Sequence, residues 1–158
     1  TYREDITEEL GIDMSQVTKP EDLTAVFAKV KEAYPDMTII DPNRANALFE
    51  SYLGKIAKID PLGDNIASSV SGVAYQDNAT VVDMYETTDF KELCELTRSW
   101  FEAGYYASDA ATTTATTAEL LMSGNCFGTF CGLGIRRLRS SIQTTMVIRL
   151  KMYRSVIR

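Results

Sequence analysis

The sequence predicts an α/β fold in which helices surround a small mixed sheet. Apolar residues recur at helical spacing in several segments, and short β-branched or apolar runs lie between those segments. Capping motifs and glycines mark where the helical segments begin and end. Helices that alternate with short strands in this way indicate an α/β layer whose strands run in mixed directions.

The first third of the chain contains two predicted helices. The segment over residues 3–13 predicts a short helix that is stopped by Gly11. A capping box precedes the second helix, in which the Thr18 hydroxyl accepts the Glu21 amide and Glu21 reaches back. This helix ends near Pro35, because proline disfavours helical backbone before it. Its apolar stripe consists of Leu23, Val26, Phe27 and Val30.

The middle of the chain contains the next strand and a hairpin. Residues 37–40 form a short β-branched strand, and a turn over 41–44 follows it. Apolar residues recur at helical spacing over residues 47–53, which predicts a helix that is closed by Gly54. Residues 72–83 are typical of a hairpin whose turn lies at 76–78.

The second half of the chain contains a longer helix, a shorter one and a strand. The longer helix is capped by Thr88 and ends at Gly104. A second capping box over 116–119 begins the shorter helix, which ends at Gly124. Residues 126–131 are a strand candidate. The expected buried face of the longer helix consists of Phe90, Leu93, Cys94, Thr97, Trp100 and Phe101.

The composition excludes several classes of protein. The chain has 158 residues, of which 45% are hydrophobic and 24% charged, so it is neither disordered nor collagenous. No apolar run reaches the roughly 18 residues needed to cross a bilayer. The sequence contains no His, which excludes Ser-His and Cys-His nucleophile pairs and most zinc sites. Because residue 1 is Thr rather than Met, we expect a processed or excised piece.

The potentially reactive side chains are not arranged as a catalytic or metal site. The three cysteines include no CxxC pair, and we expect them to be buried thiols. Cys126 and Cys131 would point to opposite faces of a strand and would not bridge. The paired glutamates at 8–9 and at 92 and 95 fit exposed helix faces better than an acid/base pair. The glycine run over 124–134 matches neither a phosphate loop nor GxGxxG.

Four segments with a particular order and spacing indicate a family. They are TYREDITEELGID, VTKPEDLTAVFAKVKEAYPD, VVDMYETTDFKELCELTRSWFEAGY and TTATTAELLMSGNCFGTF. In order and spacing they resemble extracellular solute-binding proteins of ABC importers, in particular sugar-binding lipoproteins. The resemblance covers residues 1–134 and implies a partial second lobe of a two-lobed receptor. The implied fold is a periplasmic-binding-protein-like (type II) lobe, which closes on a solute against the other lobe.

The resemblance also implies which residues bind the solute. The loops after the strands at 37–40 and 126–131 line the cleft in such lobes. This places Asn43 and Arg44 in the first loop, and Phe130, Cys131 and Gly132 in the second. Arg and Asn can hydrogen-bond sugar hydroxyls, and an aromatic ring can stack on a sugar face. The family often has a Trp or Tyr in the second loop, whereas this sequence continues with Leu.

Further expectations concern the partners and location of the parent protein. The resemblance implies a small-molecule solute, an oligosaccharide or sugar, and an ABC permease as partners. It implies an extracellular, cell-surface lipoprotein whose lipid anchor lies outside this chain. It implies no catalytic residue, cofactor, metal or nucleic acid.

The charge distribution separates residues 135–158 from the rest of the chain. All 22 acidic residues lie in residues 1–134, whereas the tail contains only basic charges. Our hypothesis is a reading-frame shift near Ile135, because codons for this tail can be chosen so that a one-base shift gives a family-like continuation. The rival interpretation is a basic arm for anionic partners. A tail with neither explanation is the third alternative.

Two other functions stay open at this point. One is a non-enzymatic protein-interaction module that uses exposed aromatic residues such as Tyr105 and Tyr106. The other is a hydrolase that depends on carboxylates. Neighbouring permease genes would favour the importer. Glycoside turnover abolished by a single Asp or Glu substitution would favour the enzyme.

Overall fold

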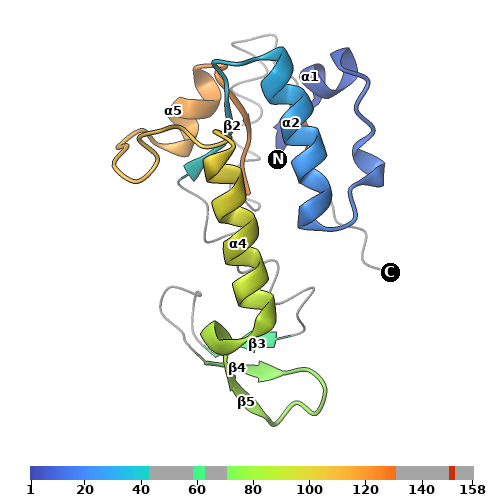
Figure 1. The fold of residues 1–158 in the computed structure, drawn as a ribbon, viewed down its shortest axis with the longest axis vertical. Coiled ribbons are helices and arrows are strands. Elements are labelled where there is room, and N and C mark those ends of the chain that lie inside the picture. The colour runs from blue at the N-terminus through green and yellow to red at the C-terminus, as the bar shows by residue number, and fades with distance from the viewer. Residues whose placement is uncertain (43–58, 63–70, 131–149, 152–158) are drawn as a thin grey trace. The chain divides into compact units, whose positions relative to one another are not determined.

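The computed structural model describes residues 1–42, 59–62, 71–130 and 150–151. The chain forms two compact units, coloured along the chain in Figure 1. The first unit comprises Thr1–Arg44 and Glu102–Arg158, and the second comprises Ala45–Phe101. The second unit is therefore an insertion into the first. No helix within the described residues is long and apolar enough to span a membrane.

The first unit contains a four-stranded mixed sheet. The strands lie in the order β2 (Thr38–Ile40), β6 (Cys126–Gly128), β1 (Tyr2–Arg3) and β7 (Leu150–Lys151). β2 and β6 are parallel, whereas β1 is antiparallel to both of its neighbours. The mixed strand directions predicted from the sequence are therefore confirmed. The edge strand β7 comes from the basic tail.

Among the described residues of this unit, three segments are α-helical, namely α1 (Glu4–Glu9), α2 (Leu23–Ala33) and α5 (Thr117–Met122). Two 3-10 turns, η1 (Met14–Gln16) and η2 (Pro20–Asp22), join α1 to α2. Gly11 follows α1 with a φ of 60°, as expected for a helix-ending glycine. The predicted stripe of α2 is buried at Val26, Phe27 and Val30. The Phe27 ring packs edge-on against the rings of Tyr105 and Phe127.

The prediction for the cap before α2 is wrong in its details. Asp22, rather than Glu21, reaches back to the turn. Its carboxylate accepts the backbone amides of Thr18 and Lys19, and the Thr18 hydroxyl donates to it at 2.9 Å. The box keeps the usual spacing but begins one residue later than predicted, with Lys19 at the N-cap and Asp22 at the third position. The capping box at α5 is confirmed, since Thr116 and Glu119 satisfy each other's amides.

The second unit contains an antiparallel sheet of β3 (Ile59–Pro61), β4 (Ser71–Ala74) and β5 (Val81–Asp83). Figure 1 shows this sheet in green, followed by α4 (Thr88–Glu102). The predicted hairpin is confirmed by the pairing of β4 with β5. A single 3-10 turn, η4 (Met84–Glu86), joins β5 to α4.

Two sequence predictions about α4 are wrong. The amide of Phe90 donates to the hydroxyl of Thr87 at 3.2 Å, so Thr87 caps the helix in place of Thr88. Leu93 and Trp100 are fully buried, but Phe101 is 53% exposed. Helical spacing identified the correct stripe but included a residue at its border. The predicted helix over residues 47–53 lies outside the described residues.

Candidate functional site

The candidate site lies where the parallel strands β2 and β6 end. Their register pairs Thr38 with Cys126 and Ile40 with Gly128, so both strands end at the same edge of the sheet. The next residues along the chain are Asp41 and Thr129. In open α/β sheets, ligands bind outside the carboxyl ends of parallel strands. This edge is therefore where the fold places a ligand site.

Asp41 joins three segments at this edge. One carboxylate oxygen, Oδ2, accepts the Thr117 hydroxyl at 2.7 Å and the Thr129 hydroxyl at 3.0 Å. The Asp41 amide donates to the Gly128 carbonyl at 3.0 Å and continues the ladder beyond β2. Asp41 is fully buried, and both threonines are buried. The end of β2, the end of β6 and the start of α5 therefore meet at one charged group.

Thr129 is also held from its other side. Its amide donates to the Thr1 carbonyl at 2.9 Å, and the amino group of Thr1 donates to the Thr129 carbonyl at 2.9 Å. Both the backbone and the side chain of Thr129 therefore have partners from different parts of the first unit. These contacts restrict the backbone that leads to Phe130.

Two consecutive tyrosines support the same edge. The Tyr105 carbonyl accepts the amides of Ile39 and Ile40 at 3.0 Å. Tyr106 is buried, and its hydroxyl has no hydrogen-bond partner among the described residues. Burial, and after it the charge of Asp41, raises the pKa of Tyr106 to about 12. The expectation that Tyr105 and Tyr106 form an exposed protein-binding surface is wrong, because both rings belong to the core.

The predicted ligand-binding residues adjoin this edge in the sequence. Phe130 is half-buried and directly follows Thr129. The remaining predicted site residues, Asn43, Arg44, Cys131 and Gly132, lie outside the described residues.

Sequence reasoning missed Asp41 and Thr129. Asp41 directly follows an apolar strand, and this position could have indicated a residue at the carboxyl edge of the sheet. The sequence pattern was interpreted only as a turn over residues 41–44. The bond to Thr129 spans 88 positions, and no local pattern reports such a pairing.

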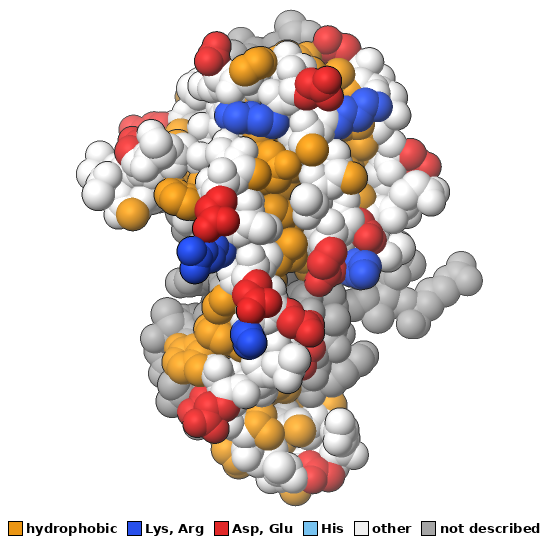
Figure 2. Space-filling view, viewed as in Figure 1, with side chains coloured by type: hydrophobic (Ala, Val, Ile, Leu, Met, Phe, Trp, Pro, Cys, Tyr) orange, Lys and Arg blue, Asp and Glu red, His pale blue; other side chains and the backbone are white. Residues whose placement is uncertain are grey.

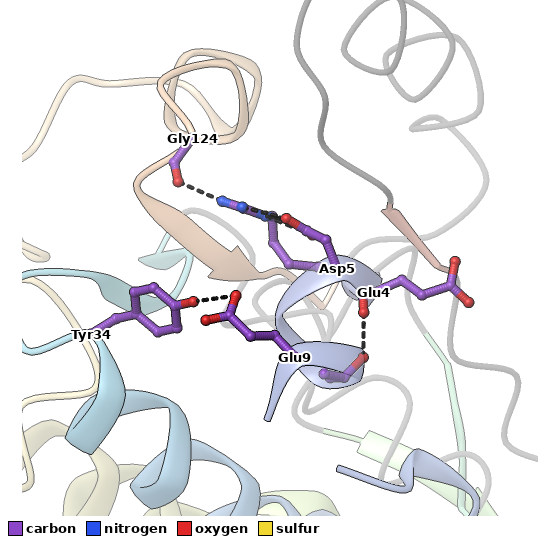
Figure 3. A network of polar contacts seen from close by, with 7 residues as sticks. Glu4, Asp5, Glu9, Tyr34 and Gly124 are labelled. Atoms are coloured by element: carbon purple, nitrogen blue, oxygen red, sulfur yellow. Dashed lines mark hydrogen bonds and ion pairs between the residues drawn. The ribbon is translucent and has the colours of Figure 1, made fainter. Parts of the chain in front are cut away.

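A second polar network lies at the opposite, amino ends of the same strands (Figure 3). The Arg3 guanidinium donates to the Gly124 carbonyl at 2.7 Å and pairs with Asp5 at 2.5 Å. The Tyr34 hydroxyl donates to Glu9 at 2.8 Å, and this bond raises the pKa of Tyr34. These contacts connect α1 to the segments before β6 and β2, and they are structural.

The acidic side chains of the described residues do not gather into a second site. Figure 2 shows them spread over the visible face. Among the described residues, no group of three or more Cys, Asp or Glu side chains is placed to hold a metal ion. Glu95 is exposed and lies 3.8 Å from the Lys91 ammonium, which agrees with the solvated helix face expected for Glu92 and Glu95.

No protein-family model matches the chain, and no match is found among curated proteins. Two solved structures of the N-glycan transport solute-binding protein NgtS from Streptococcus pneumoniae are similar to it, one of them in complex with Man1GlcNAc. Each has a TM-score of 0.61 and 24% identity, and the match covers 81% of this chain and 26% of that one. The chain thus spans about a quarter of the protein it matches. The likeness confirms the predicted fold class, a periplasmic-binding-protein-like α/β lobe.

Proposed function

We propose that this chain is part of a receptor that captures a carbohydrate for import. The observation that supports the proposal most directly is the edge formed by β2 and β6, in a fold shared with a glycan-transport protein. Buried hydrogen bonds from Thr117 and Thr129 to Asp41 hold the ends of these two strands together. Such an edge suits reversible binding of a small solute.

The proposed sugar contacts follow Asp41 and Thr129 in the chain. Phe130 stacks on the apolar face of a sugar ring. Asn43 and Arg44 hydrogen-bond sugar hydroxyls, because together their side chains offer both donors and acceptors. Cys131 and Gly132 contribute backbone groups of the second loop. None of these roles requires a covalent step, so the proposed function is binding without catalysis.

The proposal for the parent protein includes its partners. A membrane permease of an ABC importer would receive the solute, and a lipid anchor would hold the receptor at the outer cell surface. For the arginine-rich tail, residues 135–158, we keep the hypothesis of a reading-frame shift near Ile135. Sequencing the coding DNA decides it, because a single-base change must restore an acidic, family-like continuation.

The isolated chain should bind sugar weakly. A micromolar receptor binds with about −8 kcal/mol, and half of that free energy corresponds to millimolar affinity. The remaining part of the receptor is also needed to exclude water from the contacts. We therefore expect no measurable heat in calorimetry with Man1GlcNAc. Tight binding by this chain alone would contradict the proposal that it holds only part of the binding site.

Nuclear magnetic resonance can detect the expected weak binding. Titration of the chain with Man1GlcNAc to tens of millimolar should shift the ring signals of Phe130, and Phe130→Ala should abolish saturable shifts elsewhere at this edge. Tyr75→Ala is the matched control, because Tyr75 is an exposed aromatic residue of the second unit. Saturable shifts that persist in Phe130→Ala would refute the stacking role of Phe130, and shifts equal to those given by glycerol would refute a sugar site at this edge.

A further inference from the structure

The Asp41 carboxylate joins residues that are remote in sequence. Its partners Thr117 and Thr129 lie 76 and 88 positions away. Burying a carboxylate is costly, and well-packed apolar residues often stabilise a core at least as well as a buried charge. A charged residue at this position therefore calls for a reason beyond stability. One such reason is that a carboxylate oxygen accepts two hydroxyls at once and fixes their direction.

This arrangement orders the backbone that directly precedes Phe130. Thr129 is tied through its hydroxyl to Asp41 and through its backbone to Thr1. The next residue, Phe130, is half-buried and leaves the sheet at the same edge. A backbone fixed at Thr129 fixes the point at which Phe130 leaves the sheet, and this reduces the ordering cost of binding.

We propose that Asp41 is a positioning residue, which sets the Phe130 ring for carbohydrate stacking through the Thr129 hydroxyl. The inference rests on the proposed function, because it assigns Phe130 to the sugar. Asp41 itself is fully buried and has no direct contact with the ligand in this role. Thr117 contributes by holding the same oxygen from the start of α5.

A buried threonine outside the edge gives a matched control. The Thr7 hydroxyl donates at 2.9 Å to the Glu4 carbonyl within its own helix, α1. Thr7 and Thr129 are both 4% exposed. Thr7→Val and Thr129→Val therefore remove one hydroxyl each at equal burial, but only Thr129→Val breaks a contact to Asp41.

The experiment uses the 158-residue chain and measures amide hydrogen exchange, the ring signals of Phe130 and their response to Man1GlcNAc. Thr129→Val should accelerate exchange of the Asp41 and Thr129 amides by about 10-fold or more, since Asp41 loses a hydrogen-bond donor. It should also weaken the Phe130 sugar response at least about 5-fold. Thr7→Val should leave both readouts within about 2-fold of the unmodified chain.

Substitutions at Asp41 separate hydrogen bonding from packing. Asp41→Asn keeps an oxygen that accepts both hydroxyls, so the Phe130 ring signals should remain close to those of the unmodified chain. Asp41→Leu keeps the volume without the acceptor and should resemble Thr129→Val. If Asp41→Leu does not fold, Thr129→Val and Thr117→Val decide the question.

The two proposals fail in different ways. If Thr129→Val folds, and the exchange rates of the Asp41 and Thr129 amides and the Phe130 ring signals do not change, Asp41 has no positioning role. This result would leave the proposed sugar site standing. If the unmodified chain gives no Phe130 response to Man1GlcNAc, the proposed function is refuted. The exchange data then show separately whether Asp41 orders this edge.

Discussion

The Asp41 carboxylate accepts the Thr129 hydroxyl at 3.0 Å across the ends of two parallel strands. Beside this bond, the Asp41 amide donates to the Gly128 carbonyl at 3.0 Å. Side chain and backbone of one residue therefore hold the same neighbouring strand. The consequence is that the ends of β2 and β6, which precede both proposed ligand-binding loops in the sequence, are held together by side-chain and backbone hydrogen bonds.

Thr117→Val should destabilise the first unit. The Thr117 hydroxyl lies 2.7 Å from Asp41 Oδ2 in a buried environment. Removing one donor from a buried carboxylate costs about 1–3 kcal/mol. Urea unfolding followed through the exchange of the β2 and β6 amides measures this loss. Thr112→Val is the control, because the Thr112 hydroxyl is exposed and bonds only locally at 3.2 Å; an equal loss in both variants would contradict the assignment.

Tyr106→Phe should leave stability unchanged or raise it. The Tyr106 hydroxyl is enclosed and has no hydrogen-bond partner among the described residues, so its removal relieves an uncompensated desolvation cost. Tyr34→Phe is the matched comparison, because the Tyr34 hydroxyl donates to Glu9 at 2.8 Å. Its removal should lower the free energy of unfolding more than the removal of the Tyr106 hydroxyl. The free energies of unfolding of the two variants at pH 7 decide the point.

The same variant should change the response to alkaline pH. Burial raises the pKa of Tyr106 to about 12 from an unfolded value of 10.0. The free energy of unfolding is therefore unaffected by the titration of this group below pH 10 and falls as pH rises toward 12, because only the unfolded chain loses the proton. Each pH unit in this window removes up to about 1.4 kcal/mol. Tyr106→Phe should show a shallower decline from pH 10 to 12, and equal slopes would contradict the burial of the hydroxyl.

Local signals predicted much of this fold. The hairpin over 72–83, the capping box over 116–119 and the buried stripe of α2 all follow from residues within one turn or one strand pair. The spacing of apolar residues and the capping motifs depend on residues that are close together in the sequence. A single sequence is therefore enough to predict these elements. The same holds for the short strands β2 and β6.

The rest depends on contacts that no local pattern contains. Tyr105 and Tyr106 follow a helix and precede a small-residue stretch, which favours an exposed position, but both are buried. The Tyr105 ring packs against Phe27, and no local pattern reports that contact. In the sequence, Asp41 has the pattern of an ordinary turn residue. Its hydrogen bonds with Thr117 and Thr129 become visible only in the folded structure. The sequence therefore predicts a ligand-binding role for Phe130, which stays a prediction, whereas no local pattern points to Asp41.

Cys126 should resist alkylation in the folded chain. Burial, and after it the charge of Asp41, raises the pKa of Cys126 to about 12, and the side chain is 1% exposed. The reactive thiolate is therefore nearly absent at pH 8. Mass spectrometry after iodoacetamide treatment should find Cys126 modified only in denaturant. Cys94, which is partly exposed, should react earlier, and modification of Cys126 first would contradict its place in the sheet.

Gly72→Ala should destabilise the second unit by overpacking. A Cβ at Gly72 would overlap Ile59 Cγ2 and lie 3.2 Å from Met84 Sδ. Overpacking of this kind costs about 1–3 kcal/mol. Trp100, the single Trp, reports unfolding of this unit by fluorescence. Gly72→Ala combined with Ile59→Ala should lose less stability than the sum of the two single variants, because the second change removes the overlapping methyl group; simple additivity would argue against the overlap.

Asp77 should keep its charge to unusually low pH and hold the hairpin turn while it does so. Its carboxylate accepts the amides of Ala79 and Thr80 at 2.9 and 2.8 Å, and the Thr80 hydroxyl at a shorter distance. The Thr80 hydroxyl, followed by the amides of Thr80 and Ala79, lowers the pKa of Asp77 from 3.8 to about 2. The stabilisation is therefore complete above pH 4 and lost as pH falls toward 2. Carbon-detected titration of the Asp77 carboxyl group tests this directly, with Thr80→Val expected to move the midpoint back toward 3.8. A midpoint near 3.8 in the unmodified chain would show that the turn does not depend on this charge.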